Sequence, residues 1–377
     1  MTTAIEKSAT EETLVANPVG AKRKRSPRLI ERGSTTYRIL LGVGFAVAAG
    51  VIAWGGSLGP FEQGQLTRVA IYAIAIAGLN IATGYLGLIS VGHSAFFGLG
   101  AFTTGVLVVK YGWSPLATMP AALLICFVVG LVVGLPALRI KGLYLATVTL
   151  AFGVAFPEII AYFSDLTGGS KGMTIPRALL RPPSWSGFTL GEKDQWLYWL
   201  SVVVLLVVAW VIRNLVRSRY GMAMLAVRDN EIAAAASGIN IASVKTTGFG
   251  VSGAITGVAG SLFAMYMGSL YAEGSFTLLA GITLLIGLVI GGSSTQMGPL
   301  IGALIVVYLP YYTSDIGQGQ GAAVLFAVIL IAVIFVAPDG VAGAVRRGLA
   351  RFVTVQPVDP PPALIPSAPS GDQSKQA

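Results

Sequence analysis

Long runs of apolar residues, separated by short polar segments, fill most of the chain. An α-helix rises about 1.5 Å per residue, so about 20 apolar residues cross the roughly 30 Å hydrocarbon core of a bilayer. The pattern predicts an all-α, polytopic membrane helix bundle with about ten spans. We expect these spans at about 38 to 57, 66 to 83, 92 to 110, 115 to 135, 142 to 163, 196 to 213, 243 to 270, 277 to 292, 299 to 313 and 321 to 337.

Some of these stretches do not fit plain membrane-crossing helices. The runs at 277 to 292 and 299 to 313 are short and are joined by an uncharged linker, and the segment 84 to 92 is rich in glycine. Non-helical backbone persists at membrane depth only where protein or a water-filled cavity satisfies its polar groups. The pattern therefore leaves open whether 84 to 92 and 277 to 313 are re-entrant.

The two ends of the chain are polar. Residues 1 to 37 contain a cluster of lysines and arginines and predict a disordered, basic cytoplasmic arm. Residues 341 to 377 predict a cytoplasmic tail, because the prolines that follow Thr354 disfavour both helix and sheet. The transmembrane domain is expected over 38 to 340, interrupted by a polar loop at 214 to 242.

Composition and charge support the membrane assignment. With 54% hydrophobic and only 11% charged residues, the chain is too apolar for an ordinary soluble domain. The expected topology with both termini inside places 16 basic residues on the inner side and six on the outer side. The outer six are Arg68, Lys110, Lys171, Arg177, Arg181 and Lys193. Topology thus accounts for the net charge of +9, and we expect a lipid bilayer rather than nucleic acid as partner.

Small residues recur at helical spacing on two predicted spans. In lipid, such faces let helix backbones approach closely, so these two faces predict tight packing between helices. The positions are Ser94, Gly98, Ala101 and Gly105 on one span, and Gly253, Gly257, Gly260, Ala264 and Gly268 on the other. The single cysteine, Cys126, lies within an apolar run, so neither a disulfide nor a thiolate metal site is expected.

A specific motif lies between the second and third predicted spans. The segment from Asn80 to Ala101 reads NIATGYLGLISVGHSAFFGLGA. It resembles the N…GYxGLxSxGHxAFxGxGA signature of the LivM-type permease subunits of branched-chain amino-acid ABC importers, in the hydrophobic amino-acid uptake family. The resemblance continues through segments at 143 to 152, 166 to 172, 228 to 238 and 287 to 304, and covers roughly residues 38 to 340. Tyr311 and Tyr312 stand where many relatives carry an acidic residue, which weakens any transfer of substrate identity.

The resemblance implies a transport subunit rather than an enzyme. It implies a multi-pass protein of the bacterial plasma (inner) membrane that moves branched-chain or other small amino acids, with urea or short amides as alternative cargoes. The implied partners are cytoplasmic ATP-binding subunits, a second homologous (LivH-type) permease subunit and an extracytoplasmic solute-binding protein. The sequence contains no GxxxxGK[ST] phosphate loop, so ATP is expected to bind a separate subunit and no cofactor is expected here.

The polar loop at 214 to 242 resembles the coupling loop of such permeases. The implied coupling residues, which would dock on the ATP-binding subunit, are Arg228, Asp229, Glu231 and Gly238. The residues support a short helix independently, because four consecutive alanines from Ala233 favour a helix and Gly238 offers a stop. The alternative is a solvated amphipathic loop that lies on the membrane surface.

Polar side chains within or beside the spans are candidates for lining the substrate pathway. Intramembrane polar groups are costly, and they commonly face protein or a transport path. The candidates are Asn80, Tyr85, Ser90, His93, Ser94 and Glu158. The alternative for His93 and Asn80 is a packing role with satisfied hydrogen bonds, and for Glu158 it is a position at the membrane interface.

Two other classes of protein stay open at this point. An ion-coupled secondary transporter would need titratable groups at mid-membrane, for which His93 and Glu158 are the candidates. An intramembrane protease is suggested by the short GxSG motif around Ser252, with His93 as a base. Short motifs arise easily in glycine-rich spans, so this motif alone identifies no enzyme.

Overall fold

A computed structural model describes residues 28–31, 49–135, 143–316, 340–350 and 353–356, with isolated positions between 42 and 46 and between 324 and 335. The chain divides into two compact units, one of residues 43–346 and one that combines residues 1–42 with 347–377. Part of the predicted span at 38 to 57, most of that at 321 to 337 and most of the two polar ends lie outside the described residues.

The unit formed by the two ends of the chain contains one strand pair. Strand β1 (Arg28–Glu31) pairs in parallel with β4 (Val353–Gln356), with Arg28 opposite Val353 and Glu31 opposite Gln356. The sequence analysis did not expect a strand at either place. The disorder that it predicted for the rest of the arm and tail concerns residues that lie outside the described ranges.

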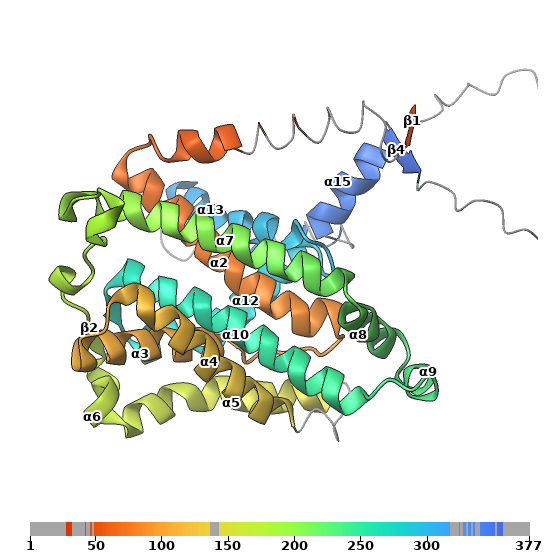
Figure 1. Cartoon of the computed structure of the whole chain (residues 1–377), viewed down its shortest axis with the longest axis horizontal. Helices are drawn as coiled ribbons and strands as arrows, with labels where there is room; N and C mark the ends of the chain where they lie inside the picture. The colour runs from red at the N-terminus through yellow and green to blue at the C-terminus, as the bar shows by residue number, and fades with distance from the viewer. Residues whose placement is uncertain are drawn as a thin grey trace, which may run out of the picture. The chain divides into compact units, whose positions relative to one another are not determined.

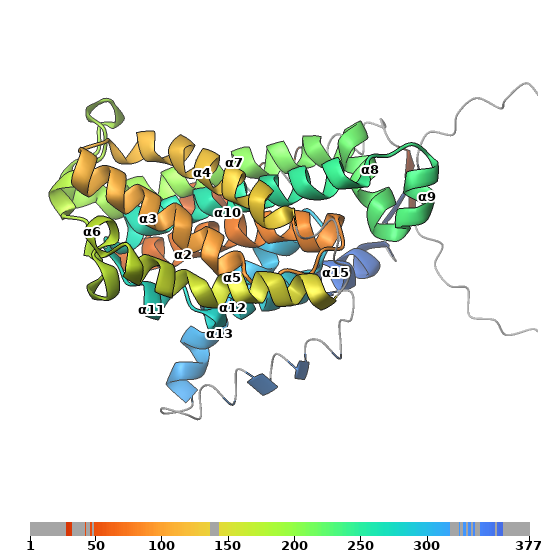
Figure 2. The same ribbon diagram turned by 90° about the horizontal axis from the view of Figure 1, so that it is seen from below.

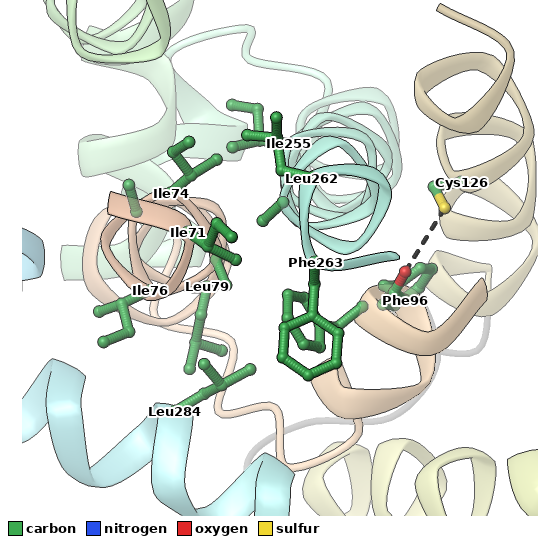
Figure 3. Packing of buried hydrophobic residues seen from close by; sticks show 14 of the residues in the cluster. Ile71, Ile74, Ile76, Leu79, Phe96, Cys126, Ile255, Leu262, Phe263 and Leu284 are labelled. Atoms are coloured by element: carbon green, nitrogen blue, oxygen red, sulfur yellow. Dashed lines mark hydrogen bonds between the residues drawn. The ribbon is translucent and has the colours of Figure 1, made fainter. Parts of the chain in front are cut away.

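Two helices form the centre of the larger unit. Helix α2 (Pro60–Asn80) and helix α10 (Ile241–Met267) are the two most buried of the long apolar helices. Asn240 caps the start of α10, where its Oδ1 accepts the Ser243 N–H at 3.0 Å, and Gly268 ends it at φ +68°. Figure 3 shows Ile71 and Ile74 of α2 directed toward Leu262 and Ile255 of α10, and Leu79 directed toward Leu284 of α12.

The outer helices pack around this pair, as Figures 1 and 2 show. They are α3 (His93–Tyr111), α4 (Pro115–Gly134), α5 (Leu143–Tyr162), α7 (Lys193–Arg217), α12 (Leu278–Gly291) and α13 (Gly298–Ile316). A further helix, α15 (Gly340–Ala350), follows near the end of the described chain. Only about a fifth of the span residues of α4 and α7 are buried (22% each), as expected of helices whose apolar faces meet lipid.

Both predicted small-residue faces are closely packed: Gly98 of α3 lies against Phe156 of α5, and the face of α10 approaches α3 at Phe97 and Gly100, which lie outside the predicted set. A methyl group added at Gly100 of α3 would overlap the carbonyl of Gly257 on α10, and one added at Gly260 would overlap the carbonyl of Phe97. These positions need glycine because the two backbones touch there. The prediction of tight helix packing on these two faces is confirmed.

The two ends of the bundle differ in character. The α9 end carries α8 (Arg219–Asp229) and α9 (Glu231–Ala236), together with the linker 292–297 between α12 and α13. The β2 end carries α6 (Ser164–Thr167), strands β2 (Met173–Thr174) and β3 (Ser269–Leu270), and α11 (Ala272–Ser275). Short 3₁₀ helices complete the β2 end at Gly169–Lys171, Arg177–Leu179, Ser184–Ser186 and Leu190–Glu192.

The all-α polytopic class is confirmed. The described residues contain six helices long and apolar enough to cross a membrane, and a seventh span results if the bent pair Ala146–Tyr162 and Ser164–Lys171 counts as one. Gly298–Thr313 is a shorter apolar helix. Within the described residues, helices lie over eight of the ten expected spans and over 49–55 of a ninth, whereas the total of ten and the cytoplasmic placement of both termini stay predictions.

The segment after α2 departs from regular helix in the middle of the bundle. Helix α2 continues as a π-helix (Ile81–Tyr85), and residues 86–92 are non-helical before α3 begins at His93. His93 lies beside Ser252 of α10. At 1.5 Å per residue, Ser252 is about 16 Å along that helix from its start, well away from the end of the bundle. The broken backbone thus lies inside the bundle, where protein groups satisfy it: Leu88 N–H donates to Ala82 O at 2.8 Å, and Val91 N–H to Thr149 Oγ1 at 3.2 Å.

Candidate functional site

A chain of hydrogen bonds runs through the buried start of α3. Nδ1 of His93 lies 2.7 Å from Ser90 Oγ, and Nε2 lies 2.7 Å from Ser252 Oγ on α10. The Ser252 hydroxyl donates to the Gly78 carbonyl of α2 at 2.6 Å. All three side chains are buried, so the network ties α2, the broken segment and α10 together at one depth.

The direction of these hydrogen bonds gives Ser252 a structural role. Because its single proton goes to the Gly78 carbonyl, Nε2 of His93 is the donor to Ser252, and in a neutral ring Nδ1 accepts from Ser90. A serine nucleophile would instead donate its proton to the base. The structure does bring Ser252 and His93 together, but in an arrangement suited to holding helices rather than to attacking a peptide bond.

Ser94 differs from its neighbours because its hydroxyl has no partner. Its Oγ is buried and makes no hydrogen bond in the described part of the chain. It faces glycines on two other helices: a methyl group added at Gly281 of α12 would lie 3.1 Å from this oxygen, and one added at Gly153 of α5 would lie 3.7 Å from it. A buried unsatisfied hydroxyl is costly, so a polar partner at this three-helix junction would stabilise Ser94.

Asn80 clamps the linker between α12 and α13. Its Oδ1 accepts the Ser294 N–H at 2.9 Å, and its Nδ2 donates to the Thr295 carbonyl at 3.1 Å. The side-chain amide of Asn80, the last residue of α2, therefore forms one donor and one acceptor bond with the linker backbone, as a neighbouring strand would. These two hydrogen bonds hold Ser294 at φ +59°, a left-handed conformation that is rare for a residue with a side chain.

Arg228 joins the same linker to the end of α8. Its Nη1 donates to the Gly84 carbonyl at 3.0 Å and to Ser294 Oγ at 2.8 Å, and the Ser294 hydroxyl donates to the Gly84 carbonyl at 2.7 Å. Nε of Arg228 pairs with Asp229 at 2.9 Å. We call the four residues Asn80, Gly84, Arg228 and Ser294 the linker junction. It connects α2, its π-helix, the α12–α13 linker and α8.

The other two pathway candidates occupy different surroundings. Tyr85 is buried in the π-helix next to the linker junction. Glu158 lies on the exposed face of α5 and is not among the side chains that contact the His93 network. The structure therefore brings together Asn80, Tyr85, Ser90, His93 and Ser94 along the broken segment, but it leaves Glu158 apart.

The predicted coupling region folds as two short helices with sequence-encoded ends. Asn230 Oδ1 caps α9 by accepting from the Ile232 and Ala233 N–H groups at 3.0 and 3.1 Å. Gly238 follows α9 at φ +82°, with the Ile239 N–H closing onto the Ala234 carbonyl at 3.1 Å. The helix and its stop at Gly238 are confirmed.

One predicted coupling residue is tied within the chain. Glu231 Oε1 lies 2.6 Å from Nζ of Lys245, whose side chain is only 3% exposed. Buried charges are strongly destabilising when unpaired, so this ion pair fixes the start of α9 against α10. The outward face of α9 is apolar, and Ile232 at its start is 79% exposed.

Tyr220 anchors α8 to the start of α10. Its hydroxyl donates to the Val244 carbonyl at 3.0 Å and also hydrogen-bonds Thr247. Burial raises the pKa of this hydroxyl, and the bond to Thr247 opposes that rise. Tyr220 thus ties α8 to the start of α10, and the Glu231–Lys245 ion pair ties α9 to it.

Sequence reasoning missed several members of these networks. Ser294, Thr295 and Lys245 were not candidates, and Ser252 was considered only as a nucleophile. The linker between the two short runs was singled out because it is uncharged, and that feature is the one signal that pointed to Ser294. Among the described residues, no group of three or more His, Cys, Asp and Glu side chains could hold a metal ion.

The fold is that of a polytopic membrane helix bundle, with a helix break inside the bundle and a helical loop at one end. The chain matches the family model described as branched-chain amino acid transport system / permease component over residues 63–338. It belongs to this family.

Relatives support the assignment. The chain is 33% identical, over 73% of its length and 68% of the relative's, to the high-affinity branched-chain amino acid transport system permease protein LivM of Salmonella typhimurium, and equally to that of Escherichia coli. The high-affinity permease protein BraD of Pseudomonas aeruginosa is 24% identical over 74% of this chain and 93% of its own length. No solved structure is significantly similar to the chain. The resemblance to LivM-type permeases is therefore confirmed.

Proposed function

We propose that this chain is the transmembrane permease subunit of an ATP-binding-cassette importer. It translocates branched-chain or other small amino acids that an external binding protein hands over, and a separate partner subunit hydrolyses ATP. Family membership supports the class of transporter, and the names of the relatives support the class of cargo. Urea or short amides are the alternative cargoes.

The proposed topology has about ten spans in the bacterial plasma (inner) membrane, with both termini in the cytoplasm. The α9 end then faces the cytoplasm and the β2 end faces outside. The excess of 16 inner over six outer basic residues supports this orientation, because cytoplasmic loops of membrane proteins are enriched in lysine and arginine.

The observation that carries the proposal is the position of Arg228. It lies three residues before Glu231, which begins α9, and its guanidinium holds both the π-helix and the α12–α13 linker. A push on α9 by a partner would therefore reach α2 and the α12–α13 pair through charge-assisted hydrogen bonds, which are among the stronger ones in proteins.

The proposed mechanism is a two-state change at the break in the membrane. Closure of ATP-binding subunits would move α8 and α9, and the linker junction would shift the π-helix and the end of α12 together. π-Bulges and left-handed residues occur frequently at sites that switch, because their strain can be redistributed between two arrangements. The break at 86–92 and the start of α3 would then open alternately to either side.

The proposed pathway runs beside this break. Ser94, with its unpartnered hydroxyl at the junction of α3, α5 and α12, would contact the cargo. Tyr85, Ser90 and His93 would form the polar wall, and Asn80 would position the linker. Glu158 would act at the membrane interface at the far end of α5.

The proposed partners follow the same scheme. ATP-binding subunits would contact α9 through Ile232 and its exposed neighbours, with Arg228, Asp229, Glu231 and Gly238 shaping that surface. A second homologous, LivH-type permease subunit would complete the pore, and a solute-binding protein would dock at the β2 end.

Reconstitution tests the proposal. Vesicles that contain this chain, a LivH-type subunit and ATP-binding subunits, with the solute-binding protein outside, should accumulate labelled leucine only when ATP is enclosed. An imposed proton gradient without ATP should give no accumulation. Uptake by this chain alone, or uptake that follows the proton gradient, would overturn the proposal in favour of a secondary transporter.

A further inference from the structure

A pocket of about 250 Å³ opens at the β2 end of the bundle, where the starts of α4 and α7 meet the end of α10. A loop segment that precedes α7 closes its remaining side. The buried side chains of Leu180, Leu197 and Met265 form the floor. Leu116 and Trp196 are half-buried and form part of the walls, so the lining is mainly apolar.

Exposed aromatic side chains surround this pocket. Trp185 lines it and is 76% exposed, and its ring meets that of Trp196 edge to face at a centroid distance of 5.8 Å. Tyr111 and Trp113, just before the start of α4, are exposed as well. Tryptophan and tyrosine concentrate at the membrane–water interface, where their rings contact both apolar groups and water. This pattern places the pocket at the headgroup level of the bilayer.

Further along both helices the exposed side chains are aliphatic. Leu124 lies about 14 Å along α4 from Pro115, and Val203 lies about 15 Å along α7 from Lys193. Both side chains are more than half exposed. Only 22% of the span residues of each helix are buried, so these surfaces face hydrocarbon. A ligand with an apolar tail can therefore leave the pocket along α4 or α7 without entering water.

Of the described residues that line the pocket, Arg181 alone is charged. It is exposed, and within the described part of the chain the ion pairs are those of Arg228 with Asp229 and Lys245 with Glu231. Arginine matches a phosphate group well, because its planar guanidinium donates two parallel hydrogen bonds to it. The pocket thus combines one phosphate-binding cation with apolar walls.

We propose that this pocket binds an anionic phospholipid of the leaflet at the β2 end. The phosphate lies against Arg181 and the exposed hydroxyl of Ser114, and an acyl chain runs past Leu116 and Trp196 onto the lipid-facing side of the bundle. Phosphatidylglycerol fits better than phosphatidylethanolamine, because the lining offers no carboxylate for an ammonium group. A free phosphate ion would contact Arg181 but would leave the apolar walls uncovered.

Thermal unfolding of the delipidated, assembled transporter tests the pocket. Phosphatidylglycerol should raise the unfolding midpoint, and Arg181→Gln should raise the lipid concentration needed for half of that rise about tenfold, as expected for loss of a charge-assisted hydrogen bond. Arg181→Lys, which keeps the charge, should retain most of the response. Arg177→Gln is the matched control, because it removes an exposed arginine of the same loop that lines a different pocket. Native mass spectrometry should find one phosphatidylglycerol fewer in the Arg181→Gln complex than in the control.

Two further ligands define the chemistry of the site. Phosphatidylethanolamine with the same chains should need a several-fold higher concentration, and glycerophosphate, which has the phosphate without the chains, should give no rise. Equal responses of the Arg181→Gln and control variants would overturn the inference, as would equal responses to the two lipids or a rise with glycerophosphate. Unchanged lipid binding in Arg181→Gln with weaker docking of the solute-binding protein would make this a protein surface instead.

Discussion

Nη1 of Arg228 donates to the Gly84 carbonyl at 3.0 Å, across 144 residues of sequence. This bond joins the helical loop at the α9 end to the π-helix that ends α2. The same nitrogen reaches Ser294 Oγ at 2.8 Å, so a single side chain meets both the break in α2 and the α12–α13 linker. A transporter driven from one end needs such a connection, because a motion that stops at α9 would leave the membrane segments unchanged.

Replacing Arg228 by Gln should uncouple transport from ATP hydrolysis. Loss of the charge-assisted bonds to Gly84 and Ser294 costs on the order of 1.5 to 3 kcal/mol, so uptake should fall at least tenfold while the assembled complex still hydrolyses ATP. Parallel assays of uptake and ATP hydrolysis in proteoliposomes provide the measurement. An Arg219→Gln variant, at the opposite end of α8, is the control. Equal uptake by the Arg228 and control variants would contradict the role assigned to the linker junction.

Replacing Ser294 by glycine should destabilise the protein less than replacing it by alanine. At φ +59° an alanine keeps the left-handed strain of about 1 to 2 kcal/mol and loses the hydroxyl bonds, whereas glycine loses only the bonds. Thermal unfolding of the purified subunit should therefore give a lower midpoint for Ser294→Ala than for Ser294→Gly. The reverse order would show that the linker does not hold this conformation.

Ser252→Ala should lower the free energy of unfolding, because Ser252 ties helices together and is not a nucleophile. The change removes the hydroxyl bond to the Gly78 carbonyl, which keeps only its bond from the Ile81 N–H, and leaves Nε2 of His93 without a partner in a buried site, at a cost of about 1 to 3 kcal/mol. Chemical denaturation in detergent provides the measurement. Thr283→Ala, which removes a hydroxyl bonded to its own helix near the surface at 2.8 Å, should change stability by less than about 0.5 kcal/mol. Similar effects of both changes would rule out the network as a helix tie.

Glu231 and Lys245 should behave as a coupled pair. Glu231→Lys places two cations together at the start of α9 and should abolish uptake, and adding Lys245→Glu should restore a large part of it. The exchange keeps opposite charges in contact, although it buries the carboxylate instead of the ammonium. Uptake assays of the two single variants and the double variant form the test. No recovery in the double variant would mean that Glu231 acts only on an external partner.

Much of the bundle could be predicted because local pattern determined it. Apolar runs of membrane length correctly predicted eight helices. The small residues at 257 and 260 predicted that another helix approaches α10 closely, and α3 does so. The coupling helix followed from its alanines and from Gly238. These features depend on residues near each other in sequence, where helix periodicity and end signals act directly.

Contacts between distant segments could not be predicted. Sequence does not show which polar groups meet across the bundle, so the pairing of Asn80 with Ser294 came only from the structure. His93 and Ser252 were considered together only as a protease pair, and their role in tying helices together came from the structure. Arg68 was counted among the outer basic residues, and the structure places it within α2, which begins at Pro60, ahead of the predicted start of the span at 66. Glu158 was a reasonable pathway candidate as an acid in a span, but helix rotation turns it to the exposed face of α5.

The central claim is that α9 meets an ATP-hydrolysing partner on the cytoplasmic side. An Ile232→Cys variant tests it directly, because Ile232 is 79% exposed and the only native cysteine, Cys126, is buried. In the assembled complex, a thiol cross-linker should join this position to the ATP-binding subunit, and a membrane-impermeant thiol reagent should label it only in inside-out vesicles. Labelling from the outer face, or cross-linking to the solute-binding protein instead, would contradict the account.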